Sequence, residues 1–156
     1  MSVEKFKEQI VPAFSFTGKN IMLGGAVYDK QPVTGVNVNM PLSTVNRHGL
    51  IAGATGTGKT KTIQRLAEAL SEQGVNVLLM DIKGDISGIS KPGTPNEKIV
   101  ERMKLIGSPW APCEYPTELM TISNEKGVRL RATVSEFGPV LFSKILELNE
   151  NQEGAV

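Results

Sequence analysis

The sequence is short of several residue types, and each shortage narrows what the chain can be. It has one cysteine, Cys113, so it cannot form an internal disulfide, and we expect a reducing compartment. Aromatic residues make up 5% of the chain, so its core has to be built from aliphatic side chains. Charge is nearly balanced, with 17 basic and 16 acidic residues. This balance excludes a strong whole-chain attraction to nucleic acid or to an anionic membrane.

Long apolar runs are also missing. No run approaches the roughly 18 residues of a membrane-spanning helix, and the charged start, residues 1–8, lacks the apolar stretch of a secretory signal. We therefore expect a cytoplasmic protein with no membrane partner. A length of 156 residues is typical of one compact domain, which buries about two thirds of the surface its unfolded chain exposes.

The apolar pattern divides the chain after residue 46. Residues 1–46 are predicted to be an N-terminal extension with short strands at 21–28 and 33–40, joined by a turn at 29–32. Residues 47–156 are predicted to form the main domain of the chain, which is incomplete.

The centre of the chain has the pattern of a strand–loop–helix–strand unit. A short apolar strand is expected at 48–52, an amphipathic helix at 59–73 that Gly74 ends, and a second strand at 75–80. Such a unit implies a parallel sheet with a right-handed crossover.

Less regular elements follow. We expect a helix at 97–106, a β-hairpin from strands at 119–123 and 128–134, and a last amphipathic helix at 138–150. The predicted fold class is therefore α/β, with an incomplete parallel-sheet core, a small β-rich N-terminal extension and a β-hairpin insertion.

A glycine-rich loop lies between the first predicted strand and its helix, and it carries the strongest chemical signal. Its spacing is G-x-x-x-x-G-K-T, in which flexible glycines let backbone amides wrap the phosphates of a nucleotide. Lys59 is placed to contact the β and γ phosphates, and is the candidate catalytic residue, while the Thr60 hydroxyl is placed to bind Mg²⁺. The predicted ATP-binding residues are Gly53, Ala54, Thr55, Gly56, Thr57, Gly58, Lys59, Thr60 and Lys61.

Asp81 is a second candidate, because it ends the strand that follows the helix, where ligands lie in open α/β sheets. It either contacts Mg²⁺, the water shell of the ion or a coupled loop, or it caps the turn at residues 83–85. Asp81 also opens a D-x-x-G sequence that is typical of GTPases, although no N-K-x-D sequence follows it. A GTPase or a small-molecule kinase therefore stays an alternative.

The sequence contains no clear acidic residue that would activate water for ATP hydrolysis. Apart from Asp81, no apolar run after the loop ends in the acidic pair that an ATPase uses to place the attacking water. A nucleotide-binding module without turnover is therefore the second hypothesis beside an ATPase.

Residues 46–60 resemble the HerA/FtsK class of P-loop ATPases. Two further stretches, residues 81–88 and residues 131–139 leading to 146–154, resemble more narrowly its bacterial HerA-like branch of YjgR type. This resemblance implies a RecA-like fold, ATP hydrolysis with Mg²⁺ and ring-shaped homo-oligomers that translocate DNA. It also implies that Lys59 and Thr60 are the phosphate and Mg²⁺ residues. Because the acidic pair and the arginine finger of such ATPases lie beyond the matched stretches, we expect this chain to be the N-terminal portion of a longer protein.

Overall fold

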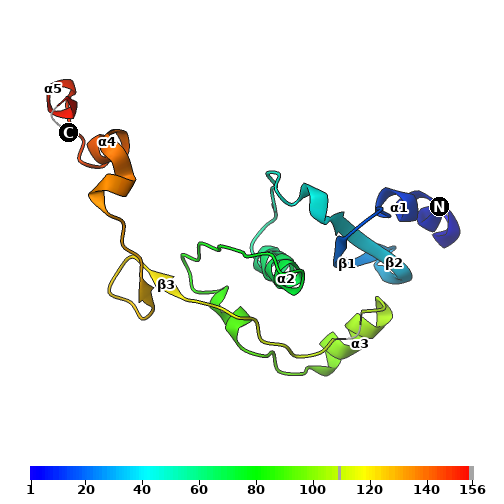
Figure 1. Ribbon diagram of the computed structural model, residues 1–156. Coiled ribbons are helices and arrows are strands. Elements are labelled where there is room, and N and C mark those ends of the chain that lie inside the picture. The colour runs from blue at the N-terminus through cyan, green and yellow to red at the C-terminus, as the bar shows by residue number, and fades with distance from the viewer. Residues whose placement is uncertain (109, 155–156) are drawn as a thin grey trace. The chain divides into compact units, whose positions relative to one another are not determined.

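The computed structural model describes residues 1–108 and 110–154 (Figure 1). The chain divides into two compact units, Met1–Thr117 and Glu118–Val156. The first unit contains both the N-terminal strands and the glycine loop with its helix. The domain boundary expected after residue 46 stays a prediction.

The first unit begins with a helix and a hairpin. Helix α1 (Val3–Ala13) is followed by strands β1 (Asn20–Tyr28) and β2 (Gln31–Pro41), which pair antiparallel. Asp29 and Lys30 form the tight turn between them with φ of 46° and 62°, the left-handed values that suit a two-residue hairpin loop. The two strands expected here are confirmed, and the turn between them is shorter than expected, because Gln31 and Pro32 already belong to β2.

Two small apolar clusters hold this unit together. One consists of Ala26, Val33 and Val36, against which Phe6 and Ile10 of α1 pack. The other joins the sheet to α2 (Lys59–Glu72): Ile21 of β1 lies with Ala69 and Leu70 of the helix, and Leu66 packs beside them. The helix expected at 59–73 is confirmed, and Gly74, with φ 75°, ends it as expected.

The rest of the first unit is largely irregular. A 3₁₀ turn, η1 (Leu42–Thr44), follows β2, and a second, η2 (Ser87–Ser90), lies in the glycine-rich stretch after Asp81. Helix α3 (Glu97–Leu105) starts at an N-cap, Asn96, whose side chain accepts from the Lys98 amide at 2.9 Å, so the helix expected at 97–106 is confirmed.

The strands expected before the glycine loop and after helix α2 are not formed. Residues 48–52 and 75–80 are irregular, and within the described residues neither segment pairs with a strand. Leu50, Leu78 and Met80 are 90%, 82% and 91% exposed. A parallel strand needs a hydrogen-bonded neighbour and cover on both faces, and these segments have neither here. The RecA-like parallel sheet therefore stays a prediction, whereas the helix of the unit is present.

The second unit contains strands β3 (Met120–Thr121) and β4 (Val128–Arg129) and helices α4 (Val134–Ile145) and α5 (Glu150–Glu153). The two strands pair parallel, with Met120 opposite Val128, so the expected antiparallel hairpin is wrong. A side chain bonds the backbone of the segment between the two strands: Thr121 Oγ1 accepts from the Ser123 amide at 3.0 Å. These local bonds compete with a hairpin ladder.

The helix expected at 138–150 is also different in the structure. Helix α4 starts earlier, at a capping box in which Thr133 and Glu136 bond each other's backbone amides. Gly138 then kinks it, with φ 68° and ψ 164°. Glu147, with φ 52°, separates α4 from the short α5. Sequence periodicity alone did not detect these interruptions. None of the helices in the described part of the chain is long and apolar enough to cross a membrane.

Candidate nucleotide site

The glycine loop, residues 53–58, is exposed and leads directly into α2. Gly58 is the N-cap residue with φ 96° and ψ 14°, and Gly56 has φ 80°. Both lie in the left-handed region, which a residue with a Cβ adopts only at a cost. Gly53 is needed for a different reason: a Cβ there would lie 2.5 Å from Thr57 Oγ1. The loop thus uses two glycines for backbone conformation and one for space.

The carbonyl oxygen of Ala54 is the centre of hydrogen bonding within the loop. It accepts from the Thr57 amide at 3.4 Å, from Thr57 Oγ1 at 2.8 Å and from Lys59 Nζ at 2.7 Å. The Lys59 ammonium is therefore folded back over the loop that precedes it. Because an ammonium binds a charged oxygen more strongly than a neutral carbonyl, a phosphate in the loop would draw Lys59 away from Ala54.

The first turn of α2 favours a bound anion. It carries the positive end of the helix dipole, contains no acidic residue and, in the part of the chain that the structure describes, has no side chain capping its amides. Its sequence, residues 59–62, adds two ammonium groups and two hydroxyls. The structure thus brings all the predicted nucleotide residues into one loop and helical turn: Gly53, Ala54, Thr55, Gly56, Thr57, Gly58, Lys59, Thr60 and Lys61.

Asp81 organises a turn of the backbone. Its Oδ1 accepts from the amides of Lys83 at 3.2 Å and Gly84 at 2.8 Å, and its Oδ2 accepts from the amide of Ile86 at 2.8 Å. These bonds, that from Ile86 first, lower the pKa of the Asp81 carboxyl. The structure thus shows the turn-capping arrangement that was one of the two interpretations of Asp81.

The oxygen atoms present suit Mg²⁺ in type, since this ion takes hydroxyl, carboxylate, water and phosphate oxygens. Asp81 already uses three of roughly four acceptor positions, so an ordered water fits it better than a direct metal bond. Over residues 1–108 and 110–154, the structure has no group of three or more His, Cys, Asp or Glu side chains that could hold a metal ion. The metal role of Thr60 and Asp81 stays a prediction.

The profile of the helicase HerA-like C-terminal family matches residues 27–156, which includes the glycine loop, α2 and the Asp81 turn. The chain belongs to this family. No curated protein and no solved structure was found to match it. The match confirms the expected resemblance to HerA-like proteins. The narrower YjgR-type branch and the N-terminal portion stay predictions.

Helix α2 is connected to the Asp81 turn through Gln64, a residue that the sequence did not single out. Lys61 Nζ donates to Gln64 Oε1 at 2.8 Å, and Gln64 Nε2 donates to the carbonyl oxygen of Asp85 at 3.0 Å. Gln64 is 8% exposed. The ammonium group of Lys61, one of the predicted nucleotide-binding residues, therefore has a protein partner in the structure.

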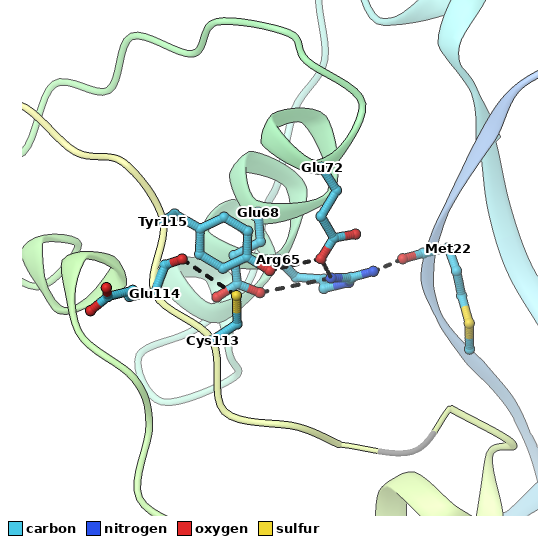
Figure 2. Close-up of polar contacts among 7 residues, drawn as sticks. All are labelled: Met22, Arg65, Glu68, Glu72, Cys113, Glu114 and Tyr115. Atoms are coloured by element: carbon cyan, nitrogen blue, oxygen red, sulfur yellow. Dashed lines mark hydrogen bonds and ion pairs between the residues drawn. The ribbon is translucent and has the colours of Figure 1, made fainter.

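A polar cluster farther along α2 was missed as well. Arg65 donates from Nε to the carbonyl oxygen of Met22 at 3.3 Å, and its guanidinium lies 3.8 Å from Glu68 and 3.6 Å from Glu72 (Figure 2). The Tyr115 hydroxyl donates to Glu72 at 2.7 Å. Burial and the hydrogen bond to Glu72 raise the pKa of Tyr115. Burial also raises the pKa of Glu68, although the nearby charge of Arg65 acts to lower it.

The spacing of Arg65, Glu68 and Glu72 on one helix could have indicated an ion-pair row, but nothing in the sequence places Tyr115 beside it. The cluster lines a groove of about 890 Å³ between α2, β1 and the segments around Ile89 and Trp110. Of the predicted nucleotide residues only Lys61 reaches this groove, so the groove is a separate feature of the HerA-like chain.

Proposed function

We propose that this chain binds Mg-ATP through residues 53–60 and is the nucleotide-binding part of an ATPase of the HerA/FtsK class, in its YjgR-type branch. The observation that carries the proposal is the glycine loop itself, which has the full phosphate-binding spacing and ends at a left-handed Gly58 where α2 begins. The family match supports it. A RecA-like core around this loop is part of the same proposal.

The residues of the loop have distinct tasks in this proposal. Backbone amides of the loop and of the first turn of α2 hold the phosphates. Lys59 exchanges the Ala54 carbonyl for the β and γ phosphates, and Thr60 Oγ1 binds Mg²⁺. Mg²⁺ supplies charge that draws the phosphates to the site when it is bound.

The test is calorimetric titration of Mg-ATP into the wild-type chain and Lys59→Ala. Loss of a charge-assisted hydrogen bond costs about 1.5–3 kcal/mol, so we expect binding to weaken roughly 10- to 100-fold. Lys7→Ala, at an exposed lysine of α1, is the matched control and should bind as the wild type does. Equal affinity of wild type and Lys59→Ala would contradict the proposal.

A second candidate function is a nucleotide-binding module without turnover. The favouring observation is that both carboxylate oxygens of Asp81 hold backbone amides, which leaves this acid poorly placed to activate water. Phosphate release by the 156-residue chain under saturating Mg-ATP separates the two functions. Sustained release supports the ATPase, whereas binding without release supports the module.

Action on DNA as a helicase or translocase, and assembly into a homo-oligomeric ring, are further proposals that rest on family membership. Two measurements test them: the rate of ATP hydrolysis with and without duplex DNA, and sedimentation velocity with and without Mg-ATP. A rate that DNA leaves unchanged would contradict the first, and a monomer in both conditions would contradict the second.

A further inference from the structure

Gln64 is one of two buried polar residues in the described part of the chain, and both ends of its amide are used. The oxygen accepts from Lys61 on the same helix, at 2.8 Å, and the nitrogen donates across to the carbonyl of Asp85, at 3.0 Å. A buried amide with two partners is fixed in orientation, because releasing either partner would leave a buried polar atom unsatisfied.

Asp85, whose carbonyl accepts from Gln64, belongs to a turn that is also stabilised by its own hydrogen bonds. This Asp81 turn, residues 81–86, has its amides gathered by the Asp81 carboxylate. Its residues are exposed except for Ile86, which is half-buried, so few apolar contacts hold it in place. The bond from Gln64 to the Asp85 carbonyl is therefore the hydrogen bond that ties the Asp81 turn to α2.

Helical spacing connects this bond to the phosphate loop. Thr60 and Gln64 are four residues apart on α2, so they share one face of the helix. The residue predicted to bind Mg²⁺ and the residue that holds the Asp81 turn thus follow each other along that face. A shift of Gln64 would move the turn relative to the Thr60 end of the helix.

We propose that Gln64 is a positioning residue that holds the Asp81 turn against the Thr60 face of α2, so that Mg-nucleotide bound at the glycine loop stabilises this turn. The inference rests on the proposed function. It assigns Gln64 no contact with nucleotide. Its action is through the Asp85 carbonyl and, beyond it, through the orientation of the Asp81 carboxylate.

Three variants of α2 separate the two bonds of Gln64 from general effects on the helix. Gln64→Met keeps the length of the side chain and removes both bonds. Gln64→Glu can still accept from Lys61 but cannot donate to Asp85. Glu72→Gln is the control, because it weakens an ion pair two turns farther along the same helix without touching the Asp81 turn.

The experiment is amide hydrogen exchange of the chain, alone and with ATP in the presence or absence of Mg²⁺. In the wild type and Glu72→Gln, Mg-ATP should slow exchange both in the glycine loop, with the first two residues of α2, and at Lys83, Gly84 and Ile86. In Gln64→Met and Gln64→Glu, loop amides should still be slowed, but those of the turn should not. The gain in ATP affinity that Mg²⁺ supplies should also fall about tenfold in these two variants, within the usual range of coupling between sites.

The outcomes distinguish the two levels of the proposal. If Mg-ATP slows the turn amides equally in Gln64→Met, Gln64→Glu and wild type, Gln64 does not couple the sites, while the proposed function stands. If Mg-ATP slows no loop amide in the wild type, the proposed function fails and this inference fails with it. Behaviour of Gln64→Glu like that of the wild type would overturn the role of the Asp85 bond.

Discussion

The two ends of α2 are built on different principles. The C-terminal half buries Ala67, Ala69 and Leu70, and it packs against Ile21 of β1. The N-terminal end is reached through exposed glycines and has no side-chain cap; its two ammonium groups, of Lys59 and Lys61, bond the Ala54 carbonyl and the Gln64 side chain. One end is stabilised by removing apolar surface from water, whereas the other presents polar groups to it.

This difference predicts that stability and binding can be changed separately. Substitutions in the buried half should lower the free energy of unfolding and leave the affinity of the folded chain for nucleotide intact. Substitutions in the loop should alter affinity more than stability, because the loop contributes little buried surface. Gln64 is the exception, since it is buried and lies one turn from Thr60.

The largest expected effect is that of Leu70→Ala on stability. Leu70 is 9% exposed and belongs to the cluster that joins α2 to β1, so the truncation should lower the free energy of unfolding by about 2–5 kcal/mol. Leu78→Ala makes the same chemical change at a side chain that is 82% exposed, and should cost less than about 0.5 kcal/mol. Urea unfolding measures both, and equal costs would mean that the cluster is not a core.

Gly58→Ala should have the next largest effect. Nothing lies within 4 Å of an added Cβ, so its cost is conformational: φ 96° forces an alanine into the left-handed region at about 1–2 kcal/mol. We expect destabilisation of that size together with weaker Mg-ATP binding. Gly49→Ala is the control, because Gly49 also has open space around it but no positive φ. Equal behaviour of the two variants would contradict the proposed role of φ.

The sequence predicted the parts of this comparison that depend on local pattern. The i, i+3, i+4 spacing of apolar residues predicted α2, and Gly74 its end, because helical periodicity and a left-handed C-terminal glycine are properties of a few consecutive residues. The loop spacing likewise predicted which residues surround the start of α2. The Asp29–Lys30 turn was predicted for the same reason.

The parts that depend on contacts between distant segments were not predicted. Residues 48–52 and 75–80 have the apolar composition of buried strands, but a strand forms only with a neighbour to pair with, and composition does not supply one. The parallel pairing of Met120 with Val128 depends on side-chain bonds in the intervening turn. Gln64 was missed because its polarity in a helix gives no sign that Asp85 is its partner.

A smaller effect should come from Gly53→Ala, and it should depend on Thr57. The added Cβ would lie 2.5 Å from Thr57 Oγ1, so one of them has to move. In a Thr57→Ala background this oxygen is gone, and the cost of Gly53→Ala should fall. A double-mutant cycle on Mg-ATP affinity should give a coupling of about 1 kcal/mol, typical of residues in contact. Additive effects would show that Gly53 is needed for some reason other than space.

The smallest expected effect is on the pH dependence of stability, and it comes from Asp81. Three amides bond its carboxylate and lower its pKa in the folded chain below the ordinary value of 3.8. A carboxyl with a lowered folded pKa stabilises the fold above the unfolded pKa, and this contribution disappears as pH falls through the folded pKa. The difference in unfolding free energy between wild type and Asp81→Asn should therefore be constant above about pH 5 and shrink toward pH 2. Urea unfolding of both proteins across that range measures it. A difference that does not change with pH would mean that the charge of Asp81 does not hold the turn, and Gln64 would then have no ordered turn to position.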